Sequence, residues 1–208
     1  MCGRYILKVS IEDLIERYAI NKNSVNIKTV PDAEIFPGKQ VPVVIASNKK
    51  RNLKQFKWGF NFSFLPRPVI NARGESLGEK KLFRRSFICR RCIIPATAFF
   101  EWKKLNKKNI KHQIFSPEER IISLAGIFDS FNSSSGDKLK CFTIITVSSS
   151  RQLQNIHHRM PLVLGKEEEE YWLDNSLEQQ ELEKLIKSYS GILKIKPLNE
   201  QSKLNFDN

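Results

Sequence analysis

The stretch IISLAGIFDSFNSSSGDKLKCFTIITVS, residues 121–148, decides the fold. Two strand-like segments, near 120–128 and 141–147, flank the polar run Asn-Ser-Ser-Ser-Gly-Asp at 132–137. A short polar run with glycine between two apolar segments is typical of a hairpin turn. We therefore interpret the run as the loop of a β-hairpin and not as a domain boundary.

Outward from this hairpin, short apolar or alternating segments predict strands along most of the chain. These strands are expected at 2–8, 41–46, 53–60, 92–100, 111–115 and in ILKIKPL, residues 192–198. Ser10 and Asp13 have the spacing of a capping box, which predicts a helix over 10–20. Acidic helices are predicted at about 167–174 and 176–189, and the Pro- and Gly-containing stretch 61–80 is expected to be mostly loop.

Many short strands with few helices predict an α+β fold, in which mixed, mostly antiparallel sheets form a barrel-like core with a few flanking helices. The 208 residues, 40% of them hydrophobic, suit a single domain over 1–208, with a loosely ordered tail after about residue 198. No apolar run approaches the length of a membrane span, and the N-terminus lacks the pattern of a secretory signal. We therefore expect a cytoplasmic, bacterial-type intracellular protein, associated with the nucleoid, whose four cysteines stay reduced.

The charge is uneven along the chain. The formal net charge is +13, and residues 1–115 hold 24 Lys+Arg against 8 Asp+Glu. Within 80–111 there are eleven basic residues and one acid, Glu101, and the basic run alternates with Phe83, Phe87, Phe99, Phe100 and Trp102. Cations mixed with flat rings suit single-stranded nucleic acid, whose phosphates need charge and whose unstacked bases need a platform. We expect no amphipathic helix to carry these residues, so nucleic acid is favoured over a membrane surface.

Cys2 carries the chemistry of the N-terminus. Its small side chain should permit removal of Met1, which would leave an α-amine and a thiol on adjacent carbons. An α-amine with a pKa of about 7.7–8.0 is partly neutral near neutral pH and can condense with an aldehyde to an imine. The thiol can then close on the imine carbon to give a thiazolidine ring, a step favoured by proximity.

Five short motifs then occur in order: MCGRY at 1–5, INAR at 70–73, FFEW at 99–102, LAGIFD at 124–129 and IHHRMP at 156–161. Together they resemble the SOS-response-associated peptidase family, SRAP, over residues 2–165. The resemblance implies one compact α/β domain with a positively charged DNA channel. It also implies that the protein senses abasic sites in single-stranded DNA and crosslinks to them through Cys2, as part of the DNA damage response.

The same resemblance implies the other catalytic residues. Glu101 becomes the general acid/base, His157 a proton shuttle to the opened sugar, and Asn71 a group that holds the sugar or the imine. The residues alone favour a structural Glu101 paired with a basic neighbour, and an isolated histidine such as His157 is more commonly a packing or surface residue. His158 is expected to be exposed.

Several residues are expected to contact DNA. Arg4 and Arg73 are candidates for phosphate contacts, and Arg159 would orient a phosphate or pair with an internal carboxylate. The full predicted set is Arg4, Trp58, Phe62, Arg73, Arg84, Arg85 and Arg159.

The chain departs from the family's pattern in two places. Where the family usually has Asn-x-x-Pro after the first helix, this chain has Glu34-Ile-Phe-Pro37, which puts one polar contact with the nucleotide in doubt. After Trp58-Gly59 the family commonly has Pro and Trp near the DNA, whereas this chain has Phe60, Phe62 and Phe64 among residues 60–64. Phe62 or Phe64 could supply an aromatic wedge.

The pair Cys89 and Cys92 supplies only two ligands, whereas a structural zinc site needs four, so we expect ordinary thiols, no metal and no cofactor. We also expect a monomer, because a reagent that acts once per lesion has no need of symmetry. Lyase activity through the Schiff base and autopeptidase removal of Met1 are further expectations. Two other classes stay open: an N-terminal-nucleophile amidohydrolase or self-processing cysteine peptidase, and a non-enzymatic module that binds single strands or modified bases.

Overall fold

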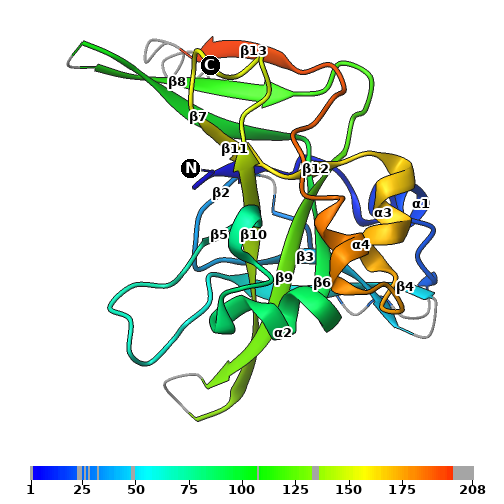
Figure 1. The fold of residues 1–208 in the computed structure, drawn as a ribbon. Coiled ribbons are helices and arrows are strands. Elements are labelled where there is room, and N and C mark those ends of the chain that lie inside the picture. Colours follow the sequence, from blue (N-terminus) through cyan, green and yellow to red (C-terminus); the bar gives the residue numbers. More distant parts are fainter. Residues whose placement is uncertain are drawn as a thin grey trace.

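The computed structural model describes residues 2–22, 25, 27, 29–31, 33–47, 50–106, 108–132 and 136–198. Two β-sheets form the centre of the fold (Figure 1). The first sheet has the order β13-β8-β7-β1-β2, and every neighbouring pair in it is antiparallel. Its strands are β1 Tyr5–Ile6, β2 Glu34–Ile35, β7 Ala98–Leu105, β8 Lys108–Phe115 and β13 Lys194–Leu198.

The second sheet closes into a barrel. Its strands are β3 Gln40–Ser47, β4 Lys50–Trp58, β6 Arg91–Ala96, β9 Ile122–Asn132 and β10 Lys138–Ser148. The ring runs β10-β4-β3-β6-β9 and closes through the pairing of β9 with β10. Only the β10–β4 contact in this ring is parallel. Three short strands extend it: β5 Asn71–Arg73 and β11 Arg159–Pro161 on β10, and β12 Val163–Leu164 on β9.

The predicted fold class is confirmed, and so is the hairpin at its centre. Strands β9 and β10 pair from Asn132 opposite Lys138 to Gly126 opposite Ile144. A Cβ atom at Gly126 would lie 2.3 Å from the side chain of Ile94 and 3.0 Å from the carbonyl oxygen of Thr143. Glycine is therefore required where β6, β9 and β10 pack closely. Loop residues 133–135 lie outside the described residues.

The helices are α1 Ile11–Arg17, α2 Lys81–Cys89, α3 Lys166–Leu173 and α4 Gln179–Glu183. The predicted capping box is confirmed, because the Asp13 amide donates to the Ser10 hydroxyl at 3.0 Å and the Ser10 amide to the Asp13 carboxylate at 2.8 Å. Helices α1, α3 and α4 gather at one side of the barrel (Figure 1). The last of them is much shorter than the predicted 176–189, and the predicted loose tail after about residue 198 lies outside the described residues.

Helix α2 corrects the prediction that no amphipathic helix carries the basic run. It buries Phe83, Ser86 and Phe87 and exposes Arg84 and Arg85 on its other side. The spacing of these apolar residues is that of one helical face, which the alternation of basic and aromatic residues concealed. Among the described residues, no helix has both the length and the apolar character needed to cross a bilayer.

Two other predictions need correction. The segment 92–100 is not one strand, because the chain turns at Thr97 and passes from β6 in the barrel to β7 in the first sheet. The Thr97 hydroxyl donates to the carbonyl oxygen of Ile6 at 3.1 Å, which fixes this crossing against β1. The stretch 61–80 is mostly loop, but β5 within it pairs with β10 in parallel and so belongs to the barrel sheet.

Buried charged residues hold the helices to the barrel. Glu169 of α3 is 1% exposed; its carboxylate accepts from Arg17 of α1 at 2.6 Å and from the Ser123 hydroxyl of β9 at 2.6 Å. Arg51 of β4 adds a longer ion pair at 3.5 Å. Arg91, 2% exposed, donates to carbonyl oxygens near the ends of α2 and α3. Arg91 is therefore a structural residue, although it belongs to the basic run.

Candidate active site around Cys2

Cys2 lies immediately before β1, where neighbouring strands fix the backbone. The Phe100 amide of β7 donates to the carbonyl oxygen of Arg4 at 3.0 Å, and Tyr5 pairs with Phe99. The Cys2 side chain is fully buried, with its sulfur 3.8 Å from the same Arg4 oxygen. Burial, with a smaller contribution from the charge of Glu101, raises the pKa of the Cys2 thiol far above its ordinary value. The sulfur is therefore held as a neutral thiol beside a carboxylate.

Glu101 projects from β7 into the same buried region and is 1% exposed. Burial raises the pKa of the Glu101 carboxyl to about 7, and the positive charge of the chain's amino terminus opposes this rise. A carboxyl with such a pKa can both accept and return a proton near neutral pH. Directly opposite Glu101 in the β7–β8 pair lies the buried His112. The sequence pattern gave His112 no catalytic role. The turn at Asn106, with φ of 54°, sets the β7–β8 register that places His112 opposite Glu101.

His157 lies in the turn just before β11. Its Nδ1 is 3.0 Å from both the amide nitrogen and the carbonyl oxygen of Arg159. The neutral ring with its proton on Nε2 accepts from the amide, whereas a ring protonated at Nδ1 donates to the carbonyl. Burial, together with positive charges that include the amino terminus and Arg159, lowers the pKa of the His157 imidazole. His158 is exposed, as predicted, and its ring stacks on that of His157 at 4.5 Å.

These electrostatic effects indicate that three of the four predicted catalytic residues, Cys2, Glu101 and His157, lie in one neighbourhood. The charge of Glu101 acts on Cys2, and the charge of the amino terminus acts on both Glu101 and His157. The residues come from three separate segments: the start of β1, the middle of β7 and the turn before β11. A thiol, a carboxyl and an imidazole are groups that nucleophilic and acid–base chemistry at a carbonyl uses.

Asn71, the fourth predicted catalytic residue, begins β5 and pairs with Ile144 of β10. Both polar atoms of its side-chain amide are buried and have no hydrogen-bond partner among the described residues. Buried amides are normally satisfied, so this side chain is available to a ligand. The preceding residue, Ile70, accepts a hydrogen bond from the Trp58 indole at 3.0 Å, and the Trp58 ring lies 5.3 Å from Tyr5. Trp58 therefore links Asn71 to the strand that follows Cys2.

The buried position of Trp58 contradicts its predicted contact with DNA. Its side chain is fully buried between Tyr5 of the first sheet and Phe142 of the barrel, which lies at 6.2 Å. The platform of rings predicted for the basic run is wrong in the same way, because Phe83, Phe87, Phe99 and Phe100 are all buried. Trp102 is the one ring of that run that keeps an intermediate exposure. These aromatic side chains pack in the hydrophobic core, although they belong to a basic stretch of sequence.

Arg159 pairs with a carboxylate, but that carboxylate, Glu75, is 51% exposed and not internal. Its guanidinium forms a two-pronged ion pair with Glu75, at 2.6 and 2.9 Å, and also donates to the carbonyl oxygen of Thr146 at 2.5 Å. Its side chain is 10% exposed. This ion pair fixes the start of β11 next to His157, and the phosphate contact of Arg159 stays a prediction.

The other predicted DNA contacts remain accessible. Arg73, Arg84 and Arg85 are exposed, and Arg4 is half-buried. Phe62 is half-buried and contacts the rings of Phe60, Phe64 and Phe131, whereas the Phe64 side chain is 66% exposed. Exposed cations and exposed rings are the side chains that contact a single strand, so these predictions stand.

The described residues contain no group of three or more His, Cys, Asp and Glu side chains placed to hold a metal ion. Cys89 is exposed at the end of α2, while Cys92 is buried in β6, and both are free thiols.

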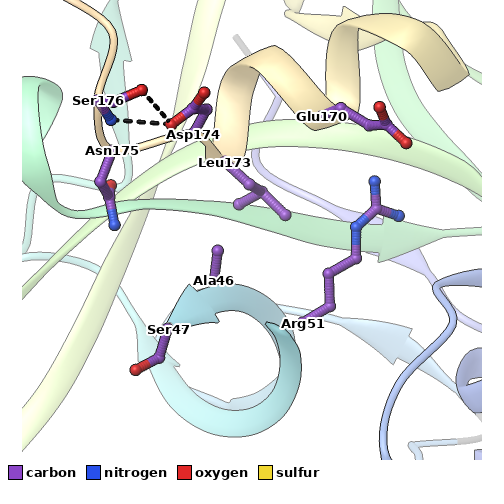
Figure 2. Close-up of a pocket in the computed structure, with 8 residues that line it drawn as sticks. All are labelled: Ala46, Ser47, Arg51, Glu170, Leu173, Asp174, Asn175 and Ser176. Atoms are coloured by element: carbon purple, nitrogen blue, oxygen red, sulfur yellow. Dashed lines mark hydrogen bonds between the residues drawn. The ribbon is translucent and has the colours of Figure 1, made fainter. Parts of the chain in front are cut away.

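A pocket lies between the β3–β4 hairpin and the end of α3. It has a volume of about 560 Å³, and Figure 2 shows Arg51 reaching toward it from one side and the Asp174–Ser176 turn lining the other. Asp174 accepts from the Ser176 amide and hydroxyl at 2.9 and 2.7 Å. The pocket is lined by Ala46, Ser47, Arg51, Glu170, Leu173, Asp174, Asn175 and Ser176. It contains none of the predicted catalytic residues.

Comparison with known proteins decides the family. The profile of the SOS response associated peptidase (SRAP) family matches residues 1–202. The chain belongs to the SRAP family. Its curated relatives include the abasic site processing protein YoqW of Bacillus subtilis, 31% identical over 198 residues that span 92% of this SRAP chain and 88% of the relative. Another is the abasic site processing protein YedK of Escherichia coli, 28% identical over 90% of this chain and 86% of that protein.

Solved structures agree with this assignment. A protein from Bacteroides thetaiotaomicron superposes with a TM-score of 0.86 and 26% identity, covering 96% of this SRAP chain and 93% of the other. A protein from Bordetella bronchiseptica, with a TM-score of 0.79 and 18% identity over 95% of this chain and all of that one, shares the fold.

Proposed function

We propose that this SRAP protein processes abasic sites in single-stranded DNA by forming a covalent crosslink through Cys2, after Met1 has been removed. The observation that carries the proposal is the buried neighbourhood in which Cys2 lies beside a carboxyl that titrates near pH 7. Family membership and relatives named as abasic site processing proteins support the choice of substrate.

The first step forms an imine. The neutral α-amine of Cys2 attacks the aldehyde carbon of the ring-opened sugar, and Glu101 accepts a proton from the nitrogen. The protonated Glu101 then returns a proton to the departing hydroxyl, so that one water leaves as the C=N bond forms. His157 moves a proton to or from the opened sugar, and the unsatisfied amide of Asn71 holds a sugar hydroxyl.

The second step closes the ring. The Cys2 sulfur adds to the imine carbon while its proton passes to the nitrogen, which gives a thiazolidine without further loss of atoms. Because the thiol is neutral at rest, this step needs a base at hand, and ionised Glu101 is beside it. If the imine instead loses the 3′ phosphate by β-elimination, the result is strand cleavage, which is the lyase side activity that we also propose.

The charge of the chain weighs against an amidohydrolase that acts on small amides. Residues 1–115 hold 24 Lys+Arg against 8 Asp+Glu, an excess that favours a polyanionic substrate. A plain binding module is disfavoured by the pairing of a buried thiol with a buried carboxyl, because neither group contributes to binding DNA phosphates.

Further parts of the proposal concern the setting. We propose that the chain itself removes Met1 by a peptidase activity, and that it acts as a single-domain monomer over residues 1–208. We also propose that it works in the cytoplasm with the nucleoid. The excess of basic residues in the first 115 positions supports a polyanionic partner.

The test is incubation of the purified protein with a single-stranded oligonucleotide that carries one abasic site, followed by a denaturing gel and intact mass. The expected product has the mass of the protein without Met1 plus DNA minus water. Cys2→Ala should lose this stable product, while it retains an α-amine and hence some strand cleavage. Cys141→Ala, which removes another buried thiol, should retain the adduct. An adduct that contains intact Met1 would refute the proposal.

A further inference from the structure

An acidic residue lies within a group of cations and rings on one face of the first sheet. We call Arg4, Glu34, Phe36, Trp102 and Lys111 the Glu34 cluster. Trp102 of β7 pairs directly with Lys111 of β8, and directly opposed residues in a sheet place their side chains on the same face. Arg4, whose carbonyl oxygen contacts the Cys2 sulfur, joins the cluster to the candidate active site.

The Glu34 carboxylate bridges the two cations of the cluster. One oxygen pairs with the Arg4 guanidinium at 3.2 Å, and the other pairs with the Lys111 ammonium group. All three side chains are partly buried, with 30% of Glu34, 32% of Arg4 and 21% of Lys111 exposed. An ion pair in such a setting is screened less than one in open solvent.

Aromatic rings contact both cations, Arg4 and Lys111. The Arg4 guanidinium lies 4.2 Å from the ring centre of Phe36 and 5.2 Å from that of Trp102. The Lys111 ammonium lies 4.1 Å from the centre of the Phe100 ring. These contacts hold both positive charges in fixed positions around one singly charged anion.

We propose that Arg4 and Lys111 form a binding site for one backbone phosphate of a nucleic acid strand, and that Glu34 occupies this site until the strand displaces it. The inference rests on the proposed function for the identity of the strand. A phosphodiester has the same single negative charge as a carboxylate, and it accepts hydrogen bonds from arginine in the same forked geometry. Glu34 therefore competes with the phosphate and weakens contact with the strand at this position.

Removing the charge of Glu34 should uncover both cations. The salt dependence of binding reports how many phosphates a protein neutralises, with a slope of log K against log salt of about −0.7 per phosphate for single strands. In the wild type the strand must first break two ion pairs, so the gain from this phosphate is small. In Glu34→Gln the full contribution should appear, as roughly fivefold tighter binding at low salt and a slope steeper by about 0.7.

The experiment measures fluorescence anisotropy of a single-stranded oligonucleotide that contains a tetrahydrofuran residue, which has no aldehyde and cannot be crosslinked. Wild type, Glu34→Gln and the double variant Glu34→Gln with Lys111→Met are titrated over a salt series. The gain should be present in the single variant and lost in the double variant. Glu119→Gln is the matched control, because its carboxylate pairs with Lys166 at 2.7 Å and is 34% exposed, and it should leave affinity unchanged within twofold.

Unchanged or weaker binding by folded Glu34→Gln would overturn the phosphate site, as would a gain that survives loss of Lys111. Near-ultraviolet circular dichroism shows whether each variant is folded, and Glu34→Asn provides a second variant if Glu34→Gln is not. The proposed function is tested separately by the adduct with aldehyde-bearing DNA. A wild type that forms adducts while Glu34→Gln binds no tighter refutes the phosphate site alone, and the opposite pattern refutes crosslinking alone.

Discussion

Two glutamates in this molecule are equally buried, and their surroundings differ. Glu101 and Glu169 are each 1% exposed. Glu169 lies among cations and hydroxyl groups, with Arg17, Arg51 and Ser123 all in contact with its carboxylate. Around Glu101 burial dominates and raises the pKa of the carboxyl to about 7. A buried acid that is compensated by cations holds elements together, whereas one whose pKa is raised by burial toward neutral pH is poised to exchange protons.

The largest expected effect comes from breaking the compensated site. Glu169→Ala leaves Arg17 partly buried without its partner and removes an acceptor from Ser123, so the free energy of unfolding should fall by about 3–5 kcal/mol. Urea denaturation measures this loss. Glu170→Ala is the matched control, because its side chain is on the same helix but exposed, and the free energy should change by less than about 0.5 kcal/mol. Equal losses for the two variants would contradict the comparison.

The second effect concerns pH and isolates Glu101. The folded protein keeps the Glu101 proton up to about pH 7, whereas the unfolded chain releases it near its ordinary pKa of 4.5. The folded state therefore binds more protons in this interval, and the contribution of Glu101 to stability is lost as the pH rises through 7. Relative to Glu101→Gln, the wild type should lose about 3 kcal/mol of stability across this range.

Urea denaturation of both proteins at several pH values provides the test, because all other titrating groups cancel in the difference. The rate of adduct formation by Glu101→Gln should fall by about 100-fold while the variant stays folded. A difference in stability that does not change with pH would show that the Glu101 pKa is not raised.

The sequence predicted one of these glutamates and missed the other, for a physical reason. Glu101 is the single acid of a long basic run, but it was the resemblance to a known family that assigned it a catalytic role. Glu169 is one of four consecutive glutamates at 167–170, and composition cannot tell which of them faces the barrel. Glu169 is the buried one because the way α3 packs on β9 turns this side chain, and not its neighbours, toward the barrel.

The same limit explains the other outcomes. The hairpin, the capping box and most strands were predictable because they depend on local pattern. The parallel pairing of β4 with β10, and with it the burial of Trp58, depends on contact between distant segments. The pairing of Arg159 with Glu75 is likewise non-local, and residue types alone left it open between a phosphate and a carboxylate.

The smallest expected effect on stability comes from the hydrogen bonds of Ser123 beside Glu169. The Ser123 hydroxyl contacts Glu169 at 2.6 Å and the Tyr18 hydroxyl at 2.8 Å, so it joins two buried polar groups. Ser123→Ala should reduce the free energy of unfolding by about 1–2 kcal/mol, as measured by urea denaturation. Tyr18→Phe removes only one of these bonds and should cost less. If the two losses simply add in the double variant, the network is not cooperative.

The enclosure of Cys2 has a consequence for the lifetime of the protein under oxidative conditions. Peroxides and alkylating agents react with exposed thiolates, and the Cys2 sulfur is neither exposed nor ionised. Cys89, on the surface at the end of α2, is the cysteine such agents meet first. The fold thereby shields the Cys2 sulfur from reagents that the surface thiol meets first.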